Sequence, residues 1–134
     1  MQHKINGTFE VTLVPQPHED DIGDPSVGRM SIAKQFFGAL AASSKGQMLA
    51  VRTDVKDSAG YVALERVTGT LEGRSGSFAL QHSGIMTRGE KQLSVTVVPD
   101  SGTDQLIGMS GTMDIEIVEG KHLYTFDYSF AASN

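Results

Sequence analysis

Glu65 and His82 are the two residues of this chain whose types and spacing best suit acid–base chemistry. In the strand register expected below, they lie diagonal to each other on neighbouring strands, on the apolar side of both. Diagonal neighbours in a sheet lie about 7–8 Å apart at Cα, within reach of long side chains. Burial would raise the pKa of the Glu65 carboxyl and lower that of the His82 ring, and groups perturbed in this way gather at functional sites. The pair could therefore serve as general acid and general base.

The same pair also fits two structural interpretations. It forms a buried polar contact, or it lies near an open end of the fold in water. On the other side of these strands, Arg66 and Ser83 are expected to face each other as an outward polar pair or a recognition patch. Because adjacent strand residues point to opposite sides, His82 would not reach Ser83, and a serine nucleophile is not expected.

The sequence patterns that could indicate a metal site are weaker than the Glu65–His82 pattern. Segment 18–21, His-Glu-Asp-Asp, lies in an acidic, proline-rich loop expected over 15–27, but its spacing matches no known metal-binding loop. Nothing in the spacing of His3, His82 and His122 brings them together as a three-histidine site. The chain has no cysteine, which excludes thiolate chemistry. We therefore expect neither a metal nor another cofactor.

Seven further residues are candidates for the wall of a ligand cavity. They are aromatic residues and methionines on the strand faces expected to point inward, namely Tyr61, Phe78, Met86, Met113, Tyr124, Phe126 and Tyr128. Tyrosine hydroxyls would orient a bound molecule, and methionines would adapt to its shape. The alternative is that these side chains only pack a solid core.

The elements that must position these residues are short strands. Fifteen glycines punctuate runs rich in Val, Thr, Ile, Phe and Tyr, and no helical periodicity extends over a useful window. Phe9, Val11 and Leu13 alternate with polar residues, which is the period of a half-buried strand. A run over 29–42 that turns at 43–46 would set Leu40 opposite Leu49 on the buried face.

Two later turns fix the expected register around the candidate site. A loop at 74–75 would pair Glu65 with Gly84, and Val67 with His82. A loop at Glu119-Gly120 is the clearest of all, because closing the hairpin there sets apolar residues opposite aromatic ones at successive positions. Those pairs are Ile115 with Tyr124, Met113 with Phe126, and Gly111 with Tyr128.

Each strand therefore has one apolar face, and no amphipathic helix is present to cover it. The sheet must cover itself. A closed barrel also removes exposed edges, whereas a sandwich of two sheets would leave some. The sequence predicts an all-β fold, a single antiparallel, roughly eight-stranded closed β-barrel over 1–134, with the sandwich as the alternative.

Composition narrows the function classes. A net charge of −5 with scattered basic residues argues against nucleic acid as a partner. The first residues carry no secretory apolar run, and no stretch is long and apolar enough for a membrane span, so we expect a cytoplasmic protein without a membrane partner.

Two segments carry a resemblance to a known family. They are GYVALERVTGTLEGRSGSFALQHSG (60–84) and VVPDSGTDQLIGMSGTM (97–113), and the likeness extends from Phe9 to Phe130. The chain resembles a bacterial family of small proteins of unknown function whose barrel is similar to that of allene oxide cyclase, in the lipocalin-like or calycin-like group. This resemblance implies the fold and little about activity, because one barrel hosts unrelated functions. No catalytic motif of allene oxide cyclase matches this sequence.

Three functions remain open at this point. The first is binding of a small apolar or amphipathic molecule inside the barrel. The second is a cofactor-independent isomerase or cyclase in which Glu65 or His82 moves a proton. The third is a structural, homodimeric interaction protein, suggested by apolar residues on the otherwise polar faces. Those residues are Phe37, Val62, Leu64 and Ile85.

Overall fold

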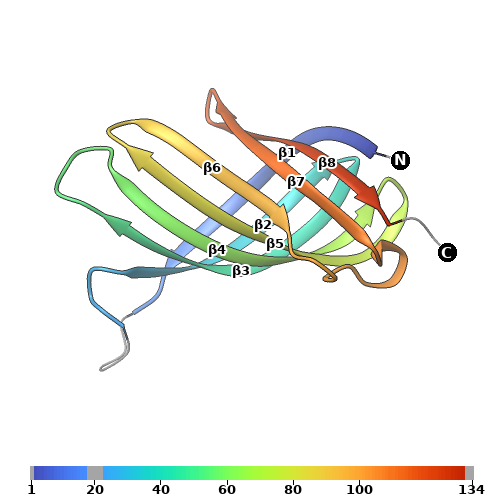
Figure 1. The fold of residues 1–134 in the computed structure, drawn as a ribbon, viewed down its shortest axis with the longest axis horizontal. Helices are drawn as coiled ribbons and strands as arrows, with labels where there is room; N and C mark the ends of the chain where they lie inside the picture. The colour runs from blue at the N-terminus through green and yellow to red at the C-terminus, as the bar shows by residue number, and fades with distance from the viewer. Residues whose placement is uncertain (1, 18–22, 132–134) are drawn as a thin grey trace.

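The computed structural model describes residues 2–17 and 23–131 as a closed antiparallel barrel of eight strands in simple up-and-down order (Figure 1). The strands are β1 (Gln2–Pro15), β2 (Gly28–Gly38), β3 (Leu40–Arg52), β4 (Ala59–Leu71), β5 (Arg74–Thr87), β6 (Glu90–Val97), β7 (Met109–Val118) and β8 (Lys121–Phe130). A short 3₁₀ helix, η1 (Asp104–Leu106), lies between β6 and β7. Pairing of β1 with β8 closes the barrel, which confirms the predicted fold class.

Three hairpins share one type of turn. Glu72-Gly73, Arg88-Gly89 and Glu119-Gly120 each place two consecutive residues at positive φ, as a two-residue type I′ turn requires. Glycine reaches this conformation without a steric penalty at the second position. The last of these turns gives the predicted pairs, including Ile115 with Tyr124 and Met113 with Phe126.

The predicted loop at 74–75 is wrong. The chain turns two residues earlier, so Glu65 pairs with Leu80 and His82 pairs with Ala63. The shift is even, so every side chain stays on its predicted face. It also removes the expected Arg66–Ser83 pair, because Arg66 faces Ala79.

The predicted turn at 43–46 is also wrong, and here the faces change. The chain reverses at Gly38 (φ 108°), and residues 43–46 lie inside β3. Leu40 therefore pairs with Leu71, and Leu49 is 45% exposed on the outer face. An odd displacement of a turn moves the following strand's side chains to the other face.

The barrel has a packed half and an open half. In the packed half, next to both termini, sixteen buried residues form one hydrophobic core, and Leu106 of η1 covers it at 1% exposure (Figure 1). At the rim of this half Arg74 stacks over Phe130, and Tyr128 donates a hydrogen bond to Glu72. The hairpins β3–β4, β5–β6 and β7–β8 surround the opposite end.

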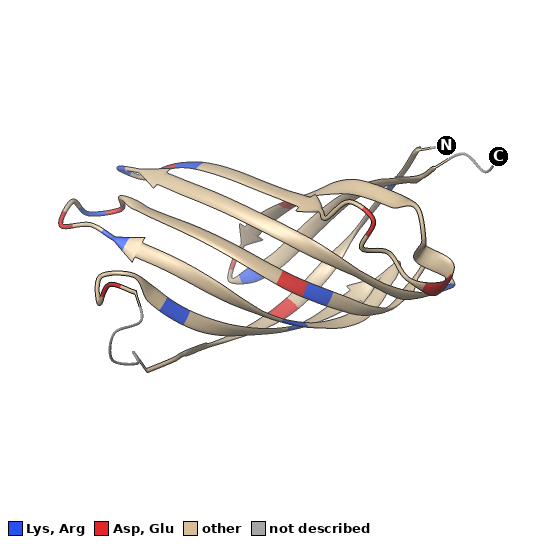
Figure 2. Ribbon diagram, turned by 60° about the horizontal axis from the view of Figure 1, so that its bottom comes forward, with Lys and Arg blue, Asp and Glu red and all other residues tan. Residues whose placement is uncertain are grey.

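Charged residues are scattered over the strands and loops (Figure 2). In the part of the chain that the structure describes, no helix is long and apolar enough to cross a membrane. The expected loop over 15–27 connects β1 to β2, and its segment 18–21 lies outside the described residues.

Candidate functional site

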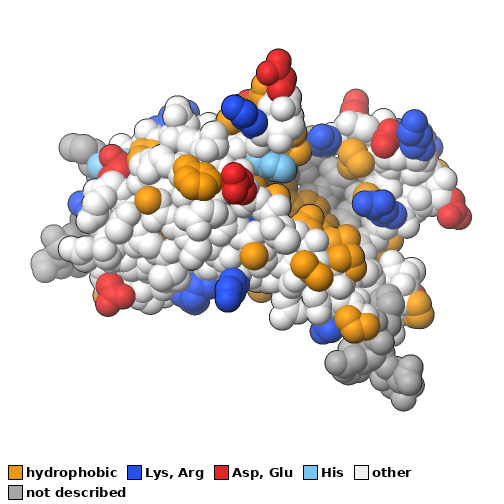
Figure 3. Space-filling view, turned by 180° about the vertical axis from the view of Figure 1, so that it is seen from behind, with side chains coloured by type: hydrophobic (Ala, Val, Ile, Leu, Met, Phe, Trp, Pro, Cys, Tyr) orange, Lys and Arg blue, Asp and Glu red, His pale blue; other side chains and the backbone are white. Residues whose placement is uncertain are grey.

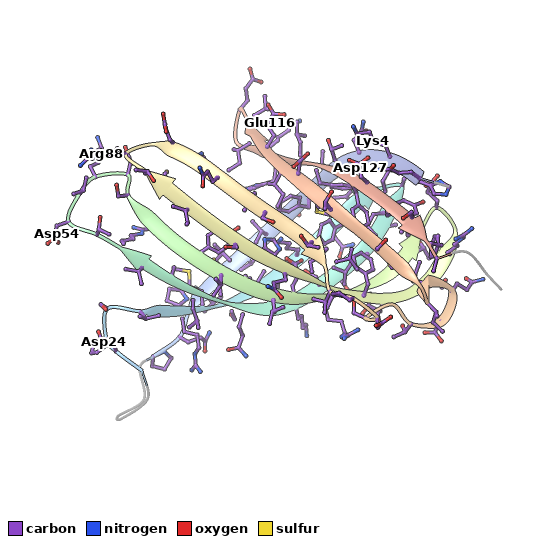
Figure 4. All side chains as sticks on the ribbon, viewed as in Figure 1. Lys4, Asp24, Asp54, Arg88, Glu116 and Asp127 are labelled. Carbon is purple, nitrogen blue, oxygen red and sulfur yellow. The ribbon has the colours of Figure 1, made fainter. Side chains whose placement is uncertain are left out.

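A buried charged cluster lies where the packed and open halves meet. Glu65 Oε2 accepts hydrogen bonds from Lys34 Nζ at 2.7 Å and from His82 Nε2 at 2.6 Å, and Glu65 Oε1 accepts one from Ser44 Oγ at 2.8 Å. All four residues are at most 9% exposed. By contrast, the Lys4–Asp127 pair, labelled in Figure 4, is partly exposed, with its charged atoms 4.0 Å apart.

Neighbouring strands supply the cluster because their inward-facing positions align across the sheet. Lys34 of β2 pairs with Ser44 of β3, and the next inward pair is Gly46 with Glu65 of β4. A Cβ on Gly46 would lie 2.0 Å from the carbonyl oxygen of Leu64 and 2.6 Å from Glu65 Cα. Only glycine therefore lets β3 and β4 approach this closely beside the carboxylate.

The Glu65 carboxyl is an anion, not a proton donor. Burial by itself would raise its pKa, but the hydrogen bond from His82 and the nearby Lys34 ammonium outweigh burial and lower the pKa to about 2. The sequence-based expectation of a raised pKa is therefore wrong, because it counted burial without the hydrogen bond from His82 and the cation from β2. At neutral pH Glu65 is a hydrogen-bond acceptor and a fixed negative charge.

The carboxylate determines which nitrogen of His82 carries a proton. An ionised carboxylate has no hydrogen to donate, so Nε2 must donate to Glu65. In the neutral ring Nδ1 is then an acceptor, and the Tyr61 hydroxyl lies 3.4 Å from it. Burial, and next the charge of Glu65, raise the pKa of Tyr61, so this hydroxyl keeps its proton. The result is a chain from Tyr61 through His82 to Glu65.

The open half contains a cavity of about 440 Å³, and the charged cluster forms its floor. Lys34 and His82 line the cavity from below, and Tyr61 stands on its wall. Most of the remaining lining is apolar, with Val11, Leu13, Met48, Leu93 and Ile115 among the contributors. Figure 3 shows this hollow at one end of the molecule, with hydrophobic side chains inside it.

The structure separates the seven predicted cavity residues into two groups. Tyr61 and Met86 line the cavity. The other five are at most 4% exposed in the packed half and do not line it, namely Phe78, Met113, Tyr124, Phe126 and Tyr128. These five residues therefore pack a solid core, as the alternative interpretation predicts, because they fill the space that a ligand would need.

Sequence reasoning brought Glu65 and His82 together but missed Lys34 and Ser44. The signal for Lys34 was present, since Lys34 alternates in phase with the apolar residues Ile32 and Phe36. A lysine in such a run indicates a buried partner of opposite charge. Ser44 could not be identified, because the misplaced turn at 43–46 assigned it to a loop.

The remaining predicted features are dispersed. His3 stacks on Tyr128 in the packed half, while His122 packs against Phe9 beside the cavity. Within residues 2–17 and 23–131 no three His, Cys, Asp or Glu residues are grouped to hold a metal. Three of the exposed apolar residues, Val62, Leu64 and Ile85, lie on β4 and β5, whereas Phe37 lies at the end of β2.

Comparison with known proteins supplies the family. No curated protein matches the chain. A family described as "Protein of unknown function (DUF3224)" matches residues 5–128. The chain is also similar to a crystal structure, at 1.84 Å resolution, of a protein with unknown function from the DUF3224 family of Shewanella oneidensis MR-1. The two are 47% identical with a TM-score of 0.90, over 98% of this chain and 100% of that one. The chain therefore belongs to the DUF3224 family, which has a bacterial member with the same barrel.

Proposed function

We propose that this protein binds a small, mainly apolar molecule in the open half of its barrel. The observation that carries the proposal is the cavity of about 440 Å³ with apolar walls and a few polar groups gathered at its floor. Ligand sites in proteins have this character and volumes of roughly 300–1,000 Å³. Tyr61, Lys34 and His82 would orient a polar atom of the ligand near the floor.

A cavity-filling variant tests this proposal. Ala50 lies on the inward face of β3 and lines the cavity, whereas Ala41 of the same strand is exposed on the outer face. We expect the neutral fluorescent probe N-phenyl-1-naphthylamine to bind the unmodified protein saturably and to lose at least about tenfold affinity in Ala50→Phe. The matched control Ala41→Phe should bind as the unmodified protein does. Absence of saturable binding, or equal binding by Ala50→Phe, would overturn the proposal.

Native mass spectrometry of the protein as purified provides an independent measurement. A retained small molecule that Ala50→Phe no longer carries would support the cavity as its site and reveal its mass.

Proton transfer is a second candidate function, favoured by the orientation of His82. Glu65 fixes the Nε2–H tautomer, which leaves Nδ1 as a base on the cavity side beside Tyr61. A bound substrate with an acidic C–H bond would displace the Tyr61 hydroxyl from Nδ1, lose its proton to Nδ1 and regain one at another carbon, so that the reaction is an isomerisation without net oxidation. In this second candidate function His82 accepts and returns the proton, and Glu65 holds the His82 ring in position.

Deuterium exchange distinguishes a proton-transferring cavity from a passive one. Phenylacetone in D₂O should exchange its α-hydrogens faster with the protein than without it, and His82→Asn should abolish the acceleration. An acceleration that survives in His82→Asn would exclude His82 as the base. If the unmodified protein does not accelerate the exchange of phenylacetone, proton transfer as the function is contradicted.

A further inference from the structure

The strand register arranges the inward-facing residues of β3 to β6 in rows across the sheet. Each row marks one level of the cavity between its mouth and its floor. From the mouth inward, these rows are Arg52–Ala59–Met86–Lys91, then Ala50–Tyr61–Gly84–Leu93, then Met48–Ala63–His82–Val95. Four residues along a strand separate the first row from the third, which corresponds to about 14 Å. The outermost row therefore begins and ends with a cation, and the innermost contains His82.

Arg52 and Lys91 are the two cations of this mouth row. They lie on the inward parity of their strands and both line the cavity. Three strand spacings separate them, about 14 Å along the sheet. In the described part of the chain neither forms an ion pair with an acidic side chain.

The charge of the lining differs from that of the whole protein. The chain carries a net charge of −5, yet the cavity is lined by Lys34, Arg52 and Lys91 and by no acidic residue among those described. Asp54, Asp57 and Glu90 are exposed on the hairpins around the mouth and lie outside the lining. Lys and Arg side chains are visible beside the hollow in Figure 3. An anion approaching this opening meets two cations that form no ion pair within the described residues.

The floor is a poorer place for an anion than the mouth. Lys34 and His82 already donate to Glu65, whose buried negative charge would repel a second carboxylate. At the mouth an anion would stay partly hydrated, so its desolvation would cost little. The apolar walls between the two levels suit a hydrocarbon body.

We propose that the ligand of this cavity is an amphipathic organic anion whose charged group binds Arg52 and Lys91 at the mouth. Its apolar body extends inward toward Tyr61 and His82. This inference rests on the proposed binding function and adds the chemical class and orientation of the ligand.

A competition experiment with two compounds tests the inference. Decanoate and 1-decanol have the same chain length and differ in charge, and the affinity of each is measured from its displacement of N-phenyl-1-naphthylamine at low ionic strength. We expect decanoate to bind the unmodified protein more tightly than 1-decanol does. In Arg52→Gln/Lys91→Gln decanoate should weaken roughly five- to tenfold, while 1-decanol should be unchanged. Raising the salt to 1 M, where the Debye length is about 3 Å, should remove most of the preference for decanoate.

The control variant is Arg88→Gln/Lys121→Gln. It removes one arginine and one lysine from hairpins at the same end of the barrel, and neither residue lines the cavity. It should change decanoate affinity by less than about twofold. An equal loss in both double variants, or equal binding of decanoate and 1-decanol, would overturn the anion inference and leave the binding proposal intact. Failure of the probe itself to bind would instead contradict the proposed function.

Discussion

Glu65 is surrounded by donors that satisfy its charge inside the barrel. In the described part of the chain no buried polar side-chain atom lacks a hydrogen-bond partner. Removing one member of such a cluster leaves the others unsatisfied, which costs more than the intact interaction contributes. The cluster therefore combines two roles, since it closes the bottom of the cavity and constrains β2, β3, β4 and β5 relative to one another.

At the residue scale we expect Glu65→Gln to destabilise the protein by about 3 kcal/mol at neutral pH, because the buried Lys34 ammonium loses its counter-charge. Urea unfolding measures the change. Glu116→Gln is the matched control, since Glu116 is exposed on the outer face of β7 (Figure 4), and it should change stability by less than about 0.5 kcal/mol. Equal stability of the two variants would contradict the expectation.

The same carboxylate predicts how stability depends on pH. The folded-state pKa of Glu65 is about 2, below its ordinary value of 4.5, so its contribution is complete above pH 4.5 and is lost as pH falls toward 2. The contribution amounts to about 3 kcal/mol, because each pKa unit corresponds to 1.36 kcal/mol. Urea midpoints at pH 6, 4.5 and 3 should therefore fall more steeply for the unmodified protein than for Glu65→Gln. Parallel acid dependence would exclude Glu65 as the source.

The pairing of Glu65 with His82 was predictable from sequence despite an incorrect register. The expected and observed registers differ by four residues in β5, and in both of them the two residues are diagonal neighbours on the inward face. The alternation of side chains fixes the face, so an even error preserves it. The charge state of Glu65 was not predictable, because it depends on Lys34 from a strand whose neighbour was misplaced.

At the element scale, turn chemistry decided which hairpins were predicted correctly. The Glu119-Gly120 pattern predicts the turn and the observed register. The predicted turn at 74–75 lies two residues beyond the same dipeptide, Glu72-Gly73, at which the chain reverses. The polar stretch 43–46 resembles a turn by composition, yet Ser44 is buried and bonded to Glu65. Amino-acid composition alone does not show that a polar residue such as Ser44 points into the barrel.

The contact between β3 and β4 at Gly46 is an element-scale prediction. Gly46→Ala should lower stability by about 2 kcal/mol, because the added methyl group would overlap backbone atoms of Leu64 and Glu65. Gly60→Ala is the control in a neighbouring strand, since its Cβ would meet nothing closer than 3.9 Å. Thermal unfolding of both variants checks the expectation, and a Gly46→Ala protein as stable as Gly60→Ala would refute the close approach.

At the scale of the whole molecule, the barrel divides into halves of different packing. Buried aromatic and aliphatic side chains fill the half near the termini, whereas the other half surrounds the cavity. Local opening costs least where few apolar contacts are buried. Amide hydrogen exchange should therefore be faster at the strand ends near residues 50, 61 and 117 than near residues 78, 97 and 126.

Binding of N-phenyl-1-naphthylamine should slow exchange in the open half and leave the packed half unchanged. Hydrogen exchange measured by mass spectrometry on peptide fragments would resolve the two regions. Uniform protection along all strands, with or without the probe, would mean that the barrel opens as a single cooperative unit.

The separation of the two halves at Glu65 has a consequence for how such a barrel can diversify. The residues that fold the protein lie mainly below the charged floor, and those that would recognise a ligand lie above it. Substitutions at positions such as Ala50, Met86 or Leu93 therefore alter the shape of the cavity at little cost in stability. In such a barrel the cavity-lining residues can change while the hydrophobic core and the charged cluster stay the same. Family members that keep the charged cluster can therefore bind different ligands.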